Sequence, residues 1–132
     1  MERKRIHRAI DKENGQWVEG YLCKCHHKDT GKYDYAIQEM FDNGYVMHEV
    51  IPETVSEYTE KCDDYCQKLF EGDECRVTRE AILAYGVIKL IDGAFSFVEH
   101  QYNTILPLFK LKTNGFELKR ICSIYDNMQS SN

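Results

Sequence analysis

Cysteine and histidine are the residues of this sequence best suited to hold a metal ion, since tetrahedral zinc sites are built from pairs of them. In an extended strand, however, Cys23 and Cys25 point to the same side about 6.5–7 Å apart, too far for both to bind one ion without a bend. Neither this pair nor the pair Cys62 and Cys66 has the glycine and apolar neighbours that are usual in a zinc knuckle. We therefore expect no metal and no cofactor. The weak metal candidates are Cys23, Cys25, Cys62 and Cys66.

The sequence carries none of the short motifs that mark a catalytic centre. It has no Gly-x-Ser-x-Gly, no His-Glu-x-x-His, no phosphate-binding glycine loop and no nucleotide fingerprint. His48 precedes Glu49, but neighbours in a strand point to opposite faces, so the two do not form a dyad. We expect the protein not to be an enzyme and assign no catalytic residue.

Nucleic-acid binding is the second hypothesis for function. A net charge of −5 and a pI near 5.5 argue against broad attraction to nucleic acid. Aromatic residues could stack on bases, but they fall at alternating strand positions, where such side chains usually build a core or an interface. Binding would have to be local and use a basic patch, either the N-terminal or the C-terminal one. The N-terminal patch is Arg3, Lys4, Arg5 and Arg8, and the C-terminal patch is Lys110, Lys112, Lys119 and Arg120.

Length and composition indicate a single globular domain. The chain has 132 residues, of which 42% are hydrophobic. No apolar run approaches the roughly 20 residues that span a bilayer, and the basic N-terminus lacks the apolar stretch of a secretory signal. We expect a cytoplasmic protein that binds no membrane. Its thiols should be reduced and free, with Cys23, Cys75 and Cys122 as small core residues.

Turn residues divide the first half of the chain into short strands. A turn cluster over 11–15 ends in the hairpin dipeptide Asn14-Gly15. After it, Val18 and Leu22 share one face of a strand, and Trp17 and Tyr21 share the other. Alternating hairpins of this kind predict an antiparallel meander. The predicted strands are 5–10, 16–24, 33–41 and 45–51.

The chain changes character at Pro52, which cannot donate to a sheet ladder and suits the first turn of a short helix. We expect a helical turn over 52–58 and a charged loop over 59–68. Residues 101–115 contain an apolar run that fits neither the helical period of 3.6 nor the strand period of two. They are predicted to form a short helix or another strand. A final strand is predicted over 117–125.

The clearest local signal is Asp92-Gly93, the preferred dipeptide of a type I′ turn, flanked by two apolar runs. A two-residue turn pairs Leu90 with Phe95 and Ile88 with Phe97 on one face. Side chains of this size contribute about 1.5–3 kcal/mol each when fully buried, so we expect the four to anchor a core.

The fold class is therefore mainly β. It comprises an N-terminal antiparallel meander over about 4–51 and a C-terminal, small, barrel-like antiparallel sheet over about 68–127. One or two short helical turns are expected beside them. We treat residues 1–132 as a single domain built from these two sub-sheets.

Several short motifs, in order along the chain, resemble those of the YopX family of phage and prophage proteins, over about residues 6–127. The chain departs from the family pattern at 62–66, at Arg120 and Cys122, and at Cys23 and Cys25. The matching segments are Ala9-x-Asp11, Trp17-Val18-x-Gly20-Tyr21-Leu22, Val50-Ile51-Pro52-Glu53-Thr54-Val55, Tyr58-Thr59, Phe70-Glu71-Gly72-Asp73, Gly86-Val87-Ile88, Asp92-Gly93-Ala94-Phe95 and Ile121-x-x-Ile124-Tyr125-Asp126-Asn127.

The resemblance implies a small, mainly β accessory protein, encoded by a phage or prophage and working in the bacterial cytoplasm. It implies no activity and no catalytic residues. We interpret Gly72 and Gly93 as turn glycines and Pro52 as a redirection of the chain. The residues to which we assign a structural role are Asn14, Gly15, Trp17, Pro52, Glu71, Gly72, Asp73, Asp92, Gly93, Phe95 and Tyr125.

The leading hypothesis for function follows from the absence of an equipped reaction centre and from the many tyrosines, which suit an interface. It is a non-enzymatic module that binds a host or phage protein, with a homo-oligomer as an allowed form.

Overall fold

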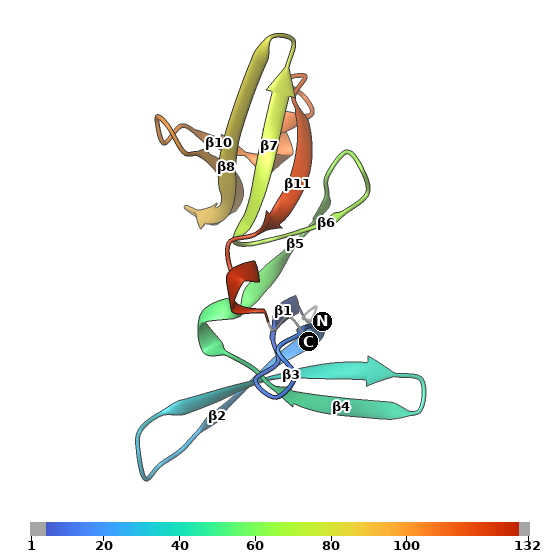
Figure 1. Ribbon diagram of the computed structural model, residues 1–132, viewed down its shortest axis with the longest axis vertical. Helices are drawn as coiled ribbons and strands as arrows, with labels where there is room; N and C mark the ends of the chain where they lie inside the picture. Colours follow the sequence, from blue (N-terminus) through green and yellow to red (C-terminus); the bar gives the residue numbers. More distant parts are fainter. Residues whose placement is uncertain (1–4, 130–132) are drawn as a thin grey trace. The chain divides into compact units, whose positions relative to one another are not determined.

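The computed structural model describes residues 5–129 and divides them into two compact units (Figure 1). The first unit holds residues 5–57 and 127–129, and the second holds residues 58–126. The fold is mainly β, with two antiparallel sheets, which confirms the predicted class. Among the described helices, none has the length and apolar character needed to cross a membrane.

The first unit is the predicted meander, in which each strand pairs antiparallel with the next along the chain. The connection after the first strand is longer than a two-residue turn, because Asp11 donates its N–H to the Gln16 carbonyl and Gly15 donates to the Asp11 carbonyl. The strands are β1 (Ile6–Ile10), β2 (Trp17–His26), β3 (Tyr33–Phe41) and β4 (Gly44–Glu49).

A small apolar core lies on one face of this meander. Ala9, Ile37 and Val50 are completely buried there, and Val18 and Leu22 of β2 pack against them, on the face that period two predicts. Gly20 lets β2 and β3 approach, because a Cβ at this position would collide with the Gln38 carbonyl.

The segment after the meander differs from the prediction. The 3₁₀ turn η1 (Pro52–Thr54) is shorter than the helical turn expected over 52–58, and the charged loop expected over 59–68 is wrong for its first part. Strand β5 (Ser56–Cys62) occupies that stretch and pairs with β1 at its start and with β6 (Lys68–Phe70) further on. Hydrogen bonding to β1 and to β6 stabilises a strand here, although the charged composition of the segment favours a loop.

The second unit contains a five-stranded sheet in the order β10-β9-β8-β7-β11. Residues 101–115 form both of the alternatives that the sequence left open, a short strand followed by one helical turn. The last strand ends two residues earlier than predicted. The elements are β7 (Asp73–Arg79), β8 (Ile82–Ile91), β9 (Ala94–Glu99), β10 (Ile105–Pro107), α1 (Leu108–Leu111) and β11 (Glu117–Ser123), and a turn η2 (Asp126–Met128) follows.

The β8–β9 hairpin has the predicted register, with Leu90 opposite Phe95 and Ile88 opposite Phe97. Asp92 and Gly93 both have positive φ, 47° and 82°, as a type I′ turn requires. One expectation is wrong: Leu90 is 46% exposed, because it lies beyond the part of the sheet that the core covers. The buried core of this unit is Leu69, Cys75, Val77, Ile88, Phe97, Leu108, Leu111 and Leu118.

Candidate interaction surface

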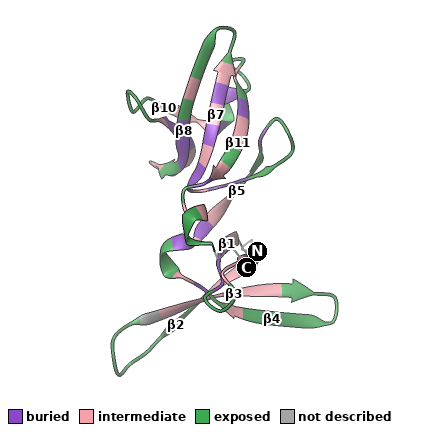
Figure 2. Ribbon diagram, in the orientation of Figure 1, coloured by how far each residue is buried: buried purple, intermediate pink, exposed green. Residues whose placement is uncertain are grey.

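The β3–β4 hairpin of the first unit extends past the core, and its residues near the turn are exposed (Figure 2). Apolar residues on both of its faces are among them. Ile37 is fully buried, but side chains nearer the turn have no core beneath them. Exposed groups of this kind, gathered on one element, mark interaction sites more often than scattered ones do. Five large apolar residues here are 45% to 60% exposed: Met40, Phe41, Tyr45, Val46 and Met47.

Strand β4 also has an open backbone edge, because it is the last strand of its sheet. Val50 donates its N–H inward, to the Tyr35 carbonyl at 3.1 Å, and Glu49 accepts on the outer side, from Lys12 N–H at 2.9 Å. The hydrogen-bonding direction alternates along an antiparallel strand. Tyr45 and Met47 therefore direct their N–H and C=O groups outward, where no strand among residues 5–129 pairs with them.

A hollow of about 540 Å³ lies beside this edge, where the turn after β1 approaches the end of β4. Lys12 stands at its rim, with its ammonium group 3.2 Å from a carboxylate oxygen of Glu49. The residues that line the hollow are Asp11, Lys12, Glu13, Asn14, Val46, Met47, His48 and Glu49.

His48 fixes the hairpin against this turn. Its Nδ1 lies 2.7 Å from Asp11 Oδ2 and its Nε2 lies 2.9 Å from Glu39 Oε1, so one imidazole joins β4 to both β3 and the end of β1. Asp11 is itself buried, and its other carboxylate oxygen accepts the backbone N–H groups of Glu13 and Asn14.

The chemistry of this cluster is that of a structural clamp. Burial alone would lower the pKa of His48, but hydrogen bonds to Asp11 and Glu39 outweigh it and raise the pKa. Burial likewise would raise the pKa of Asp11, whereas the hydrogen bonds from His48 and from the turn lower it. In the protonated form, which the raised pKa favours, both ring nitrogens donate to carboxylates and the imidazole keeps no lone pair for a general base.

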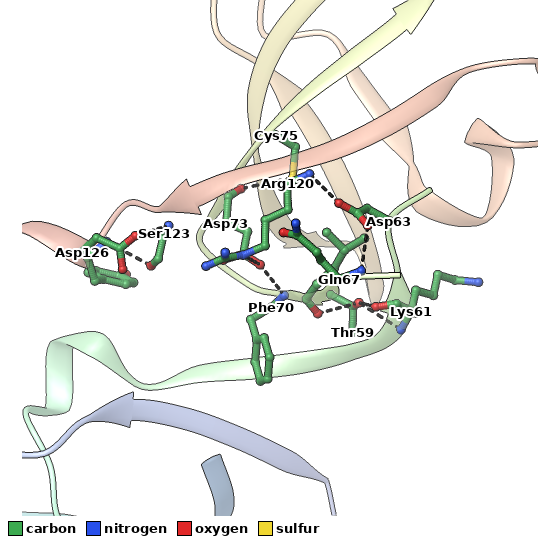
Figure 3. Close-up of polar contacts among 12 residues, drawn as sticks. Thr59, Lys61, Asp63, Gln67, Phe70, Asp73, Cys75, Arg120, Ser123 and Asp126 are labelled. Atoms are coloured by element: carbon green, nitrogen blue, oxygen red, sulfur yellow. Dashed lines mark hydrogen bonds and ion pairs between the residues drawn. The ribbon is translucent and has the colours of Figure 1, made fainter. Parts of the chain in front are cut away.

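In the second unit, Asp73 is the centre of a buried polar network (Figure 3). Its side chain is completely buried, accepts the Phe70 N–H at 2.8 Å and forms an ion pair at 3.0 Å with Arg120 Nε. Gly72, beside it, has φ +88°, and a Cβ there would lie 3.1 Å from the Tyr125 ring. The motif residues Gly72, Asp73 and Tyr125 therefore meet in one corner that holds the ends of β7 and β11 together.

The segment over 62–66 is fastened to β11 by two carboxylates. Asp63 accepts the N–H groups of Tyr65 and Gln67 within its own turn and that of Arg120 at 2.8 Å (Figure 3). Asp64 accepts the Leu118 N–H at 2.6 Å. Two of the places noted above as departures from the family pattern, 62–66 and Arg120, are thus in direct contact.

The other residues with an assigned structural role are spread over both units. Trp17 lies under the guanidinium of Arg8, 4.4 Å from the ring centroid. Asn14 accepts the Gln16 N–H at 2.8 Å inside the first turn. Pro52 begins η1. Glu71 and Phe95 are half-buried in the second unit, and Asp92 and Gly93 form the exposed hairpin turn there.

The cysteines fall in different environments. Cys75 is completely buried, and burial followed by the charge of Asp73 raises the pKa of its thiol. Cys23 and Cys122 are half-buried, while Cys25, Cys62 and Cys66 are exposed. Cys23 and Cys25 belong to the first unit, and Cys62 and Cys66 to the second. No group of three or more metal-ligating side chains is gathered among residues 5–129.

The basic residues of the nucleic-acid hypothesis are partly engaged inside the protein. Arg8 is buried against Trp17, and Arg120 is paired with Asp73. Arg5 lies 2.8 Å from Glu57. Arg3 and Lys4 lie outside the described residues. Nucleic-acid binding stays a prediction, for which a salt-dependent gel shift is the test.

Sequence reasoning missed both the open hairpin and the His48 clamp. The signal was present in the turn at 42–44, because the register that this turn sets places His48 opposite Ile37, and Glu39 on the same face. Asp11 was treated as a turn residue, and nothing local indicated that its carboxylate would meet a residue 37 positions away.

Comparison with known families agrees with the motifs in the sequence. The model of the YopX protein family matches residues 6–129, which is nearly the whole chain. No curated protein matches the sequence. The chain belongs to the YopX family.

Proposed function

We propose that the protein is a non-enzymatic interaction module, an accessory protein of a phage or prophage that acts in the bacterial cytoplasm by binding another protein. The β3–β4 hairpin is the binding surface. The observation that carries the proposal is the coincidence, on one strand, of exposed apolar side chains with an unpaired backbone edge. Edge strands of this kind bind by adding a strand to the sheet.

Photo-cross-linking in cells tests the proposal. A photoreactive amino acid at Met47, on the open edge, should give discrete cross-linked protein species that mass spectrometry identifies. The matched control is the same amino acid at Leu83, which is 57% exposed against 46% for Met47 but lies on β8 of the second unit. Cross-linked products that are equal at the two positions, or missing at Met47, would refute the proposal.

A further inference from the structure

The occupant of the open edge can be inferred from the strand itself. We propose that β4 pairs antiparallel with β4 of a second copy of this chain about a two-fold axis, with Val46 facing Val46. This inference rests on the proposed function, since it names the partner of the same surface. An isologous contact requires a surface that complements itself. In one register, the strand over 44–48 complements a second copy of itself.

Hydrogen bonding selects that register. Tyr45 and Met47 are the residues whose backbone groups point outward, and an antiparallel ladder must place such residues opposite each other. With Val46 on the axis, Tyr45 of each copy faces Met47 of the other, and every outward group of both residues is paired. Centring on Met47 would set Tyr45 against Glu49, whose carbonyl already accepts from Lys12. Centring on Tyr45 would set Met47 against the turn residue Asn43.

The distribution of charged residues along β4 favours the same register, with Val46 facing Val46. Charged residues make up 30% of the chain, yet between Gly44 and Met47 there is none. Edge strands in natural sheets are usually protected by lysine, proline or inward charges, and none of these occurs between Gly44 and Met47. In the chosen register His48 faces Gly44 and Glu49 faces Asn43, so no like charges are opposed. The exposed side chains of Tyr45, Val46 and Met47 cover one another.

The hollow beside the edge accommodates the end of the second hairpin. Past the five paired residues, the second copy reaches its own turn at Asp42 and Asn43 and reverses direction. The outer edge of the first copy is closed from Glu49 onward by Lys12, at the rim of the 540 Å³ hollow. Asp42 of the second copy therefore arrives beside Lys12, which gives an opposite-charge contact at each end of the interface.

Sedimentation equilibrium of the purified full chain tests the inference. The wild type should be a dimer, and Val46→Lys and Val46→Glu should each raise the dissociation constant roughly tenfold or more, because like charges then meet on the axis. An equimolar mixture of the two variants should restore the dimer, since lysine now faces glutamate. Leu83→Lys, an equivalent change on an exposed apolar residue of the second unit, should leave the dimer unchanged.

The outcomes separate this inference from the proposed function. A wild type that stays monomeric, or two Val46 variants that dimerise as well as the wild type, would overturn the second copy as partner. Cross-linking at Met47 to a different protein would then still support the proposed function. A dimer that both variants break and their mixture restores establishes the register, because only pairing across Val46 makes the two substitutions complement each other.

Discussion

The two units bury their sheets to different extents. In the second unit, eight buried apolar residues form one cluster under the five-stranded sheet. In the first unit the cluster has only three, and the hairpin that leads away from it is exposed. The polar networks differ as well. Asp73 is paired with an arginine, which stays charged at every physiological pH, whereas Asp11 is paired with a histidine, which does not. The polar network of the second unit therefore keeps its charges at physiological pH, whereas that of the first unit can titrate. The first unit also keeps an edge at β4 with which no strand among residues 5–129 pairs.

The largest effect is expected from Asp73→Ala. Its removal leaves the buried Phe70 N–H without its acceptor and Arg120 without its ion-pair partner, which should lower the free energy of unfolding of the second unit by about 3–5 kcal/mol. Hydrogen exchange of the β7 and β11 amides measures the loss. Asp92→Asn, at the exposed turn, serves as control. A loss below about 1 kcal/mol would mean that the network does not hold the sheet together.

Ile37→Ala tests the smaller core. Ile37 is completely buried, so the cavity should cost the first unit about 3 kcal/mol. Trp17 is the only tryptophan of the chain and lies in this unit, so its fluorescence during urea unfolding reports the loss directly. Ile82→Ala, at a half-exposed position of the second unit, should leave that signal unchanged. Equal effects of the two variants would contradict the assignment of separate cores.

Gly72→Ala separates backbone strain from crowding. At φ +88° alanine is strained, and its Cβ would also press on the Tyr125 ring at 3.1 Å, so we expect a loss of about 2 kcal/mol in the second unit. Gly93→Ala has a similar φ of +82° with open space around it, and should cost only about 1 kcal/mol. Chemical denaturation followed by circular dichroism measures both. If the two losses match, the Tyr125 contact has no energetic weight.

The smallest effect is the pH dependence of the first unit. His48 has a raised pKa, so its contribution is fully present below the ordinary value of 6.5 and is lost as pH rises through the higher value in the folded protein. Asp11 has a lowered pKa, so its contribution is present above 3.8 and is lost as pH falls through the lower folded value. Stability should therefore peak between these limits and fall by about 1 kcal/mol on the alkaline side.

The control for this pH dependence is His48→Gln, which keeps a hydrogen-bonding side chain but cannot titrate. Trp17 fluorescence should show that the alkaline loss disappears in this variant. A wild-type stability that rises with pH above 6.5 would contradict the sign.

The sequence predicted strands best where turn chemistry and period two agreed. The β8–β9 hairpin is the clearest case, because Asp92-Gly93 sets its register without help from the rest of the chain. It failed for β5, whose pairing depends on segments far away in sequence. The interaction surface could not be predicted from the sequence either, because the exposure of Met47 depends on how far the core extends beneath the hairpin. Local periodicity carries no information on that distance.

Strand β11 explains another limit of period-two reasoning. Its register shifts between Arg120 and Cys122, so Arg120 faces Cys75 and Ser123 faces Asp73, on one side of the sheet despite their odd spacing. Ile121 is the extra residue, and its side chain is half-exposed.

This irregularity makes the end of β11 tolerant of a deletion. Loss of the codon for Ile121 would convert the bulge into a regular ladder, because Cys122 and Ser123 could keep their present partners without it. Elsewhere in a strand, an insertion or deletion of one residue inverts every side chain beyond it. A variant of this protein without Ile121 should therefore still build the same sheet.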